Sequence, residues 1–204
     1  EEVARHEAAL TAYALDRLAK IPQLLIYGVS DPARAGERLG VIPLQLKNIP
    51  HFKAAAILGY EFAIGVRSGC FCAHPYILHL LGITPEEARQ VRARMLARDK
   101  SEMPGLFRAS FGLYNTFEDI DLFAEALENI ANGHYQGKYI QDKASGEYRP
   151  LGWAPDYDQY FSVNTHSMLE AGRPLLCCAF YHQMIVAECK SPNAFTRSFP
   201  LSFH

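Results

Sequence analysis

The sequence predicts an α+β fold in which helices cover a small, mostly antiparallel sheet. Three observations lead to this prediction. Short apolar runs bounded by Gly and Pro alternate at short spacing with segments of helical period, two Thr residues precede acidic helix-start patterns, and there is no repeat or low-complexity tract. A two-layer arrangement is the most economical way to bury the apolar faces of such elements.

Composition supports one globular domain, or a domain with a tail. The chain has 204 residues with 20 basic and 22 acidic side chains, a formal net charge of −2, and 49% of its residues are hydrophobic. A domain of this length buries a sizeable core without disulfides or metals. Because a near-zero charge gives no broad electrostatic footprint, we expect a small-molecule or protein partner, with no nucleic-acid and no membrane binding.

Cysteine usage predicts a reducing, cytoplasmic setting. There are five cysteines, an odd number, and two of them, Cys177 and Cys178, are adjacent, which is not the pattern of a disulfide framework. The most apolar stretch, residues 175–189, is too short and too polar to span a bilayer. The chain starts at Glu1 with no initiator Met, so we expect it to be part of a longer protein.

The first half of the chain predicts three strands and two helices. Residues 3–21 have apolar side chains at helical spacing and stop at Pro22, and residues 24–27 form a short apolar run typical of a buried strand. After a loop over 31–40, residues 41–47 predict a strand at the sheet edge because of Pro43. The remaining predictions are a short helix over 51–59, a strand over 63–67 and a loop over 68–75.

The second half contains the clearest helix starts. Thr84-Pro85-Glu86-Glu87 and Thr116-Phe117-Glu118-Asp119 are capping patterns, and they predict helices that run to about residue 98 and to a left-handed end at Gly133. Residues 106–112 predict a strand between them. From 135 to 160 the composition shifts to Tyr, Gly, Asp and Pro, and 143–147 predicts a turn between two extended pieces of a segment that wraps over a surface.

The most informative segment is the run VRSGCFCAHP over residues 66–75, where Cys70, Cys72 and His74 alternate. Three interpretations of the two cysteines remain open on spacing alone: buried structural thiols, zinc ligands, or a nucleophilic thiol. Zinc is disfavoured because paired Cys-x-x-Cys units are absent, so we expect no metal. A nucleophile would need a nearby cation, and Arg67, Arg108 or His74 could provide it.

Arg108 lies in an apolar strand, where a guanidinium needs an anion. It could bind a substrate carboxylate through its planar N–H groups, or it could form an ordinary ion pair. Asn115, just before the second Thr, is typical of a turn. His51 and His79 lie in apolar helical stretches, and we expect packed or surface histidines there rather than ligands.

Two strings in this order, AIGVRSGCFCAHPY and FRASFGLYNTFEDIDLFAEALENI, resemble the small C-terminal domain of class V aminotransferase-fold enzymes, in particular the cysteine desulfurase-like branch. The resemblance covers approximately residues 3–133 and includes HEAALTAYALDRLAKIPQLLIYG and LGVIPLQL. Molybdenum-cofactor sulfurases have a similar Arg-x-Gly-Cys-Phe-Cys string. The resemblance implies the C-terminal domain fold of fold-type I pyridoxal-phosphate-dependent transferases.

The resemblance also implies roles for particular residues. Cys72 would be the nucleophile that takes sulfur from L-cysteine as a persulfide, Arg108 would bind the substrate carboxylate, and Asn115 would occupy an assisting position. Cys70 stands where many desulfurases have a histidine, and Arg67, Cys70 and His74 are further assisting candidates. In the family the pyridoxal phosphate forms a Schiff base with a lysine of a larger N-terminal domain. None of the seven lysines of this chain has that sequence context.

These considerations give one overall prediction with alternatives. We expect a class V aminotransferase-like small domain over 1–133, an extended wrapping segment over 134–162 and an unassigned tail over 163–204. The chain alone would be inactive. Its expected partners are a second copy in a homodimer or a missing large domain, and a sulfur-acceptor protein. The alternatives are a transaminase, a molybdenum-cofactor sulfurase, or a stand-alone non-catalytic thiol or interaction module.

Overall fold

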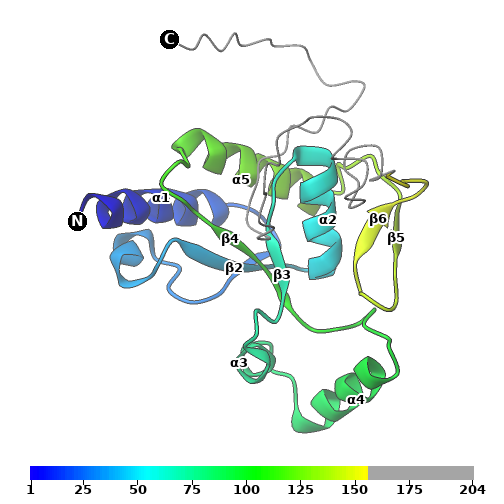
Figure 1. The fold of residues 1–204 in the computed structure, drawn as a ribbon. Coiled ribbons are helices and arrows are strands. Elements are labelled where there is room, and N and C mark those ends of the chain that lie inside the picture. The colour runs from blue at the N-terminus through cyan, green and yellow to red at the C-terminus, as the bar shows by residue number, and fades with distance from the viewer. Residues whose placement is uncertain (156–204) are drawn as a thin grey trace, which may run out of the picture.

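The computed structural model describes residues 1–155, and a four-stranded antiparallel sheet lies at their centre (Figure 1). The elements in chain order are α1 (Glu2–Leu18), β1 (Leu24–Ile26), the 3₁₀ helix η1 (Pro32–Glu37), β2 (Val41–Leu46), α2 (His51–Phe62), β3 (Arg67–Gly69), α3 (His74–Leu80), α4 (Pro85–Leu96), β4 (Leu106–Ser110), α5 (Phe117–Ala131), β5 (Tyr139–Gln141) and β6 (Tyr148–Pro150). The predicted α+β class, with helices on a small antiparallel sheet, is confirmed.

The strands follow the spatial order β1-β2-β4-β3, and every neighbouring pair is antiparallel. On one face of the sheet, side chains from β2 and β4 pack against α1, α2 and α5 to form the main core. The fully buried members include Ile42, Leu44 and Phe107 from the strands. Burial of side chains of this size contributes about 1.5–3 kcal/mol each, so this helix-covered face stabilises the fold.

The opposite side, called the second face below, is covered differently. Cys70, Ile77 and Leu106 form a small separate cluster there, where α3 packs against one end of β4. The segment 74–105 leaves the sheet after β3, forms α3 and α4, and returns into β4 (Figure 1). We call this segment the α3–α4 excursion. None of the residues of α4 is buried.

Backbone oxygens attach the returning end of the excursion to the rest of the molecule. His51 Nε2 donates to the carbonyl oxygen of Met103 at 2.9 Å, and Gln141 Nε2 of β5 donates to that of Ser101 at 2.9 Å. The amide of Lys100 also donates to the carbonyl oxygen of Lys143, in the turn between β5 and β6. Helix α3 thus has a small apolar cluster, whereas α4 buries no residue and the segment after it is attached by a few hydrogen bonds.

Several local predictions are confirmed. Thr84 and Thr116 both form capping boxes, α5 buries the expected face through Ile120, Phe123, Leu127 and Ile130, and Gly133 has a positive φ of 76° just past that helix. The turn over 143–147 lies between β5 and β6, which pair as an antiparallel hairpin. Capping patterns and periodicity depend only on neighbouring residues, which is why the sequence predicts them well.

The prediction that Pro43 places its strand at the edge is wrong, because β2 lies between β1 and β4. In an antiparallel strand the N–H and C=O of one residue point to the same neighbour. The carbonyl oxygen of Pro43 accepts from the amide of Tyr27, just beyond the end of β1. The position of the missing N–H of Pro43 therefore faces the end of the β1–β2 ladder. The strand loses at most one hydrogen bond there.

Two further strand predictions need correction. The first strand is not buried: β1 is an edge strand, and Leu25 is 40% exposed. The predicted strand over 63–67 begins instead at Arg67. Helix α2 continues to Phe62, and Ala63 caps it in the left-handed region with φ 55°, so the chain turns where the predicted strand would begin.

No helix among the described residues is long and apolar enough to cross a membrane.

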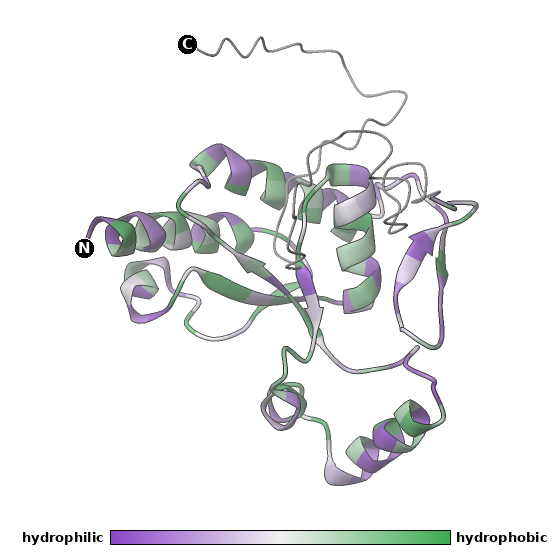
Figure 2. Ribbon diagram, viewed as in Figure 1, coloured by the Kyte–Doolittle hydropathy of each residue, from purple (hydrophilic) through white to green (hydrophobic). Residues whose placement is uncertain are grey.

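The hydropathy colouring shows β2 as largely hydrophobic and β3 as polar (Figure 2), in agreement with their central and edge positions. The tail over 163–204, the end of the wrapping segment and the cysteines at 177, 178 and 189 lie outside the described residues.

Candidate functional site

Arg108 reaches the second face of the sheet because it alternates with core residues. Its neighbours in β4, Phe107 and Ala109, point into the main core. Since successive side chains of a strand point to opposite faces, Arg108 lies on the second face. Pro43 is its cross-strand partner on β2, and Arg67 is its partner on β3.

The two arginines form a cationic pair on this face. Side chains directly opposite each other on neighbouring antiparallel strands project from the same face, so Arg67 and Arg108 stand side by side. Partial burial, together with the charge of Arg67, holds the pKa of Arg108 below its ordinary value. Arg108 Nε is buried without a hydrogen-bond partner, and no acidic side chain of residues 1–155 forms an ion pair with Arg108. A bound anion would stabilise the positive charge of Arg108 and would give its Nε a hydrogen-bond acceptor.

Cys72 follows β3 in a tight turn. The amide of Ala73 donates to the carbonyl oxygen of Cys70 at 2.8 Å, and the two residues between them, Phe71 and Cys72, have positive φ values of 52° and 60°. Gly69 just before the turn also has a positive φ, 112°, a conformation that favours glycine. The turn leaves the side chain of Cys72 exposed.

Phe71 connects this turn to the arginine pair. Cζ of Arg108 lies 5.0 Å from the centre of the Phe71 ring, within the range of a cation–π contact. The residue next to the exposed thiol therefore touches the guanidinium. Cys72 and Arg108 are 36 positions apart in the sequence, and Phe71, the residue before Cys72, is in contact with Arg108. Sequence reasoning missed Phe71, and its only signal there was an aromatic residue between two cysteines.

Cys70 is buried, whereas Cys72 is exposed. Cys70 is 4% exposed, its Sγ donates to the carbonyl oxygen of Pro104 at 3.1 Å, and burial raises the pKa of its thiol. The nucleophile in thiol chemistry is the thiolate, which such surroundings disfavour. Cys70 fits the structural-thiol interpretation, whereas Cys72 is free to react.

Within residues 1–155, no hydrogen bond or ion pair joins the remaining candidates, His74 and Asn115, to Cys72 or Arg108. His74 is exposed at the first position of α3. Both ends of the Asn115 amide are used locally, since Oδ1 accepts from the amide of Gly112 at 2.7 Å and Nδ2 donates to Asp119 at 3.1 Å. This is the turn role that Asn115 has by default. No group of three His, Cys, Asp or Glu side chains within 1–155 is arranged to hold a metal ion.

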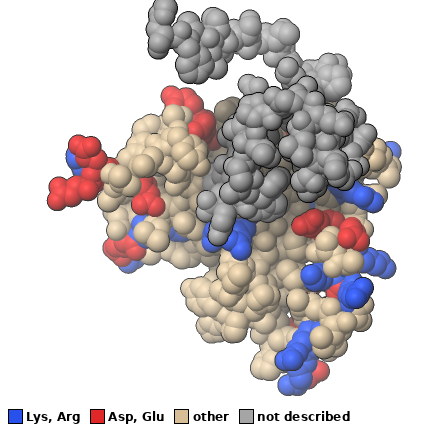
Figure 3. Space-filling view, viewed as in Figure 1, with Lys and Arg blue, Asp and Glu red and all other residues tan. Residues whose placement is uncertain are grey.

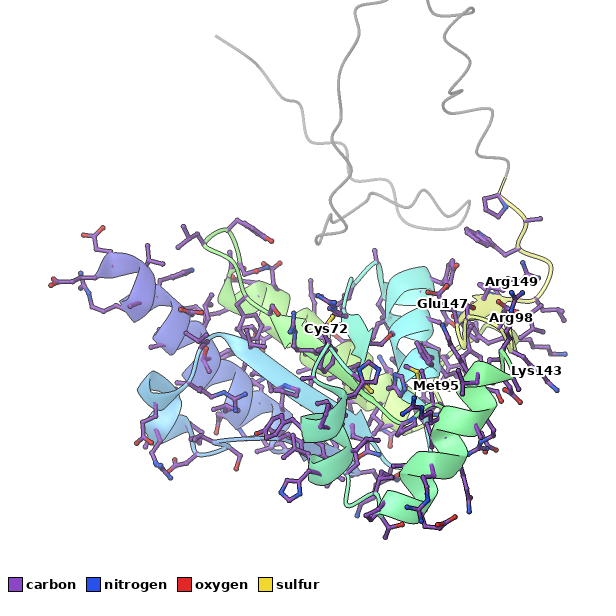
Figure 4. The ribbon with its side chains drawn as sticks, turned by 60° about the horizontal axis from the view of Figure 1, so that its bottom comes forward. Cys72, Met95, Arg98, Lys143, Glu147 and Arg149 are labelled. Carbon is purple, nitrogen blue, oxygen red and sulfur yellow. The ribbon has the colours of Figure 1, made fainter. Side chains whose placement is uncertain are left out.

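Two cavities flank the site without containing it. One of about 500 Å³ lies between α3 and α4 and is lined by Cys70 and His74, and another of about 550 Å³ is lined by His51 and Met103. Neither is lined by Cys72 or Arg108. In Figure 4, Cys72 also lies apart from the charged group at the end of α4 and on the β5–β6 hairpin, which includes Arg98, Lys143 and Arg149. Cys72 is exposed, and Arg108 is partly buried.

The cavities described in residues 1–155 lack the lysine that binds pyridoxal phosphate. The group needs a lysine for its imine and donors around its phosphate. No lysine lines either cavity, and those with described side-chain contacts are used elsewhere: Lys20 pairs with Asp16 on α1, and Lys53 donates to Tyr135. What this part of the chain offers is an exposed thiol and an arginine that has no ion pair within residues 1–155.

Comparison with known proteins identifies relatives of this chain among the cysteine desulfurases. The chain is similar to a probable cysteine desulfurase of Treponema pallidum, 35% identical over 122 residues that cover 60% of this chain and 24% of the relative. A cysteine desulfurase of Klebsiella pneumoniae is 31% identical over 129 residues, which cover 63% and 25%. The chain therefore spans about a quarter of the length of these curated relatives.

Among solved structures, the apo structure of a cysteine desulfurase from Thermococcus onnurineus NA1 is similar, with 26% identity and a TM-score of 0.48 over 63% of this chain and 26% of that one. The family model described as aminotransferase class-V matches residues 1–123, which is more than half of the chain and includes both Cys72 and Arg108. The chain belongs to the aminotransferase class-V family.

Proposed function

We propose that residues 1–133 form the small C-terminal domain of a pyridoxal-phosphate-dependent cysteine desulfurase, with residues 134–162 as an extended wrapping segment. The observation that carries the proposal is the contact between the Phe71 ring and Arg108, because Phe71 precedes the exposed Cys72 and Arg108 has no ion pair within residues 1–155. The similarity to bacterial cysteine desulfurases supports it. An amino acid that carries both a carboxylate and a sulfur matches these two groups.

Arg108 would bind the carboxylate of L-cysteine. Its planar N–H groups suit bidentate pairing with a carboxylate, and the neighbouring charge of Arg67 adds attraction for an anion. A substrate fixed at one end can turn its sulfur towards a thiol on the adjacent turn. Binding at Arg108 thus contributes orientation as well as affinity.

Cys72 would accept the sulfur. Its thiolate forms an S–S bond with the sulfur of L-cysteine while the Cβ–S bond breaks, and Cβ gains a proton. The net change, Cys72–SH plus L-cysteine to Cys72–S–SH plus L-alanine, balances in atoms and electrons. Because the turn leaves the thiol on an open surface, the same sulfur atom can afterwards reach a sulfur-acceptor protein.

The cofactor belongs to another part of the enzyme in this proposal. The curated relatives are about four times as long as the matched region, and neither of the two cavities described above is lined by a lysine. A large domain, in the same polypeptide or in a homodimer partner, would supply the lysine and would close the open side of Cys72 and Arg108. The isolated chain would then be inactive, and the assembled enzyme would work in the cytoplasm.

The decisive experiment measures alanine and sulfide formation from L-cysteine by the intact, cofactor-loaded enzyme. Cys72→Ala is expected to lower both by about 100-fold or more, because no other described thiol is exposed. Binding of the cofactor, followed by its absorbance, is expected to persist. Arg108→Lys is expected to raise the KM for L-cysteine by about 10-fold through loss of bidentate pairing.

Cys70→Ser is the matched control, since a serine hydroxyl can also donate to the carbonyl oxygen of Pro104. Desulfuration is expected to survive this change. Sulfide release that continues in Cys72→Ala would overturn the proposal. Formation of a 2-oxo acid in place of alanine would favour a transaminase, one of the alternatives that the sequence leaves open.

A further inference from the structure

The turn that carries Cys72 has an unfavourable backbone. Positive φ at both central residues, with the hydrogen bond from the Ala73 amide to the Cys70 carbonyl, is the pattern of a type I′ turn. Such turns favour Asn and Gly, but here the central residues are Phe71 and Cys72. An L side chain in the left-handed region raises the energy of the backbone, so contacts outside the turn must hold it in this shape.

Those contacts come from the two residues before the thiol. Cys70 is buried and donates to the carbonyl oxygen of Pro104 at 3.1 Å. Phe71 packs against the cluster around Leu106, and its ring lies over Arg108. The ring of Phe71 is therefore the attachment nearest to Cys72.

The stack leaves Arg108 able to bind an anion. An aromatic ring covers the flat face of a guanidinium, whereas a carboxylate binds in the guanidinium plane, at its N–H edge. The two partners therefore occupy different sides of Arg108. A ring on one face also restricts the orientation of the guanidinium and removes water from it, which strengthens pairing at the edge.

We propose that Phe71 is a positioning residue, which through its stack on Arg108 holds the strained Cys72 turn in register with the bound substrate carboxylate. This inference rests on the proposed function for its substrate, but the coupling between Phe71 and Arg108 stands on the geometry alone. The coupling makes the position of the thiol depend on the orientation of Arg108. Loss of the ring should release the turn even when packing is retained.

Amide hydrogen exchange of Ala73 in the full chain tests the coupling, because this amide closes the turn. Phe71→Leu keeps an apolar side chain with similar strain at positive φ but removes the π face, and it is expected to speed exchange about 3- to 30-fold. Phe71→Tyr retains the ring and is expected to restore slow exchange. Unchanged exchange at the Leu44 amide in β2 shows that each variant is folded.

A double-mutant cycle with Arg108→Lys separates positioning from simple packing. If the stack holds the turn, Phe71→Leu has little further effect on Ala73 exchange once Arg108 is changed, and the effects of the two substitutions do not add. Additive effects would overturn the inference. Amide exchange needs neither cofactor nor desulfurase activity. Its result is therefore independent of the Cys72→Ala test of the proposed function.

In the cofactor-loaded enzyme, Phe71→Leu is expected to lower kcat about 10-fold while the KM for L-cysteine changes less than about 3-fold, because the edge of Arg108 stays available and only the thiol loses its position. Phe71→Tyr is expected to recover kcat. A change confined to KM would contradict positioning of Cys72 and would assign Phe71 to substrate binding instead.

Discussion

Helices α4 and α5 begin with the same chemical device but have opposite environments. Thr84 with Glu87 and Thr116 with Asp119 both form capping boxes. Helix α5 nevertheless buries six residues against the core, whereas α4 buries none. Capping satisfies the free amides of a helix start without regard to what the helix packs against. The difference teaches that local signals fix where these helices start and that the apolar pattern fixes which of them supports the fold.

The contrast extends to function. Figure 3 shows Lys and Arg mixed with Asp and Glu around α4 and the β5–β6 hairpin, and α4 itself has ion pairs between Arg89 and Glu86 and between Arg94 and Glu102. The turn with Cys72 leads into the α3–α4 excursion, and Arg108 follows directly after it. The candidate site thus lies where the weakly packed excursion joins the firmly packed sheet.

The largest expected effect is on core packing. Leu127→Ala in α5, at a fully buried position, should lower the free energy of unfolding by about 2–5 kcal/mol through lost burial and a cavity. Leu96→Ala in α4 is the matched control, at 77% exposure, and should change it by less than about 0.5 kcal/mol. Urea unfolding measures both. Equal losses would show that α4 contributes to the core after all.

An intermediate effect concerns pH. Burial lowers the pKa of His51 from its ordinary value of 6.5, so the unfolded chain binds this proton more readily than the folded chain. The contribution of neutral His51 is complete above about pH 7.5, and the free energy of unfolding falls as pH drops below about 6.5, by at most about 1.4 kcal/mol per pH unit. Denaturant unfolding between pH 5 and 8 measures the slope.

His51→Gln isolates this effect, since a glutamine amide can still donate to Met103 but does not titrate. Glu102 is the acidic residue that lines the same cavity, and its ion pair with Arg94 is unaffected by the change. The slope between pH 5 and 7 should become smaller in His51→Gln and stay the same in His79→Gln, an exposed counterpart. A slope that persists in His51→Gln would assign the pH dependence to other groups.

The smallest expected effect compares the two caps. Thr116→Ala should lower the free energy of global unfolding by about 1 kcal/mol, because α5 belongs to the cooperative core. Thr84→Ala removes the same hydrogen bond but should act only locally, as faster amide exchange in the first turn of α4. Global unfolding together with residue-resolved exchange distinguishes the two. A global loss in Thr84→Ala would mean that the excursion unfolds with the core.

Sequence reasoning succeeded for features that depend on neighbours in the chain, such as both capping boxes, the buried face of α5 and the turn at 143–147. It failed for Pro43 and for the strand over 63–67, because strand order and the true end of α2 depend on distant partners. It selected Cys72 and Arg108 as candidates but did not foresee the ring of Phe71 between them.

By itself the sequence determined the α+β class, the helix starts and the family to which the chain belongs, since these follow from residue types at fixed local spacing. Only the tertiary structure decided which of two cysteines, two positions apart, is accessible. A strained turn and the pairing of β3 with β4 turn Cys70 inwards and leave Cys72 exposed. Those outcomes depend on contacts between residues more than 30 positions apart, which no local pattern records.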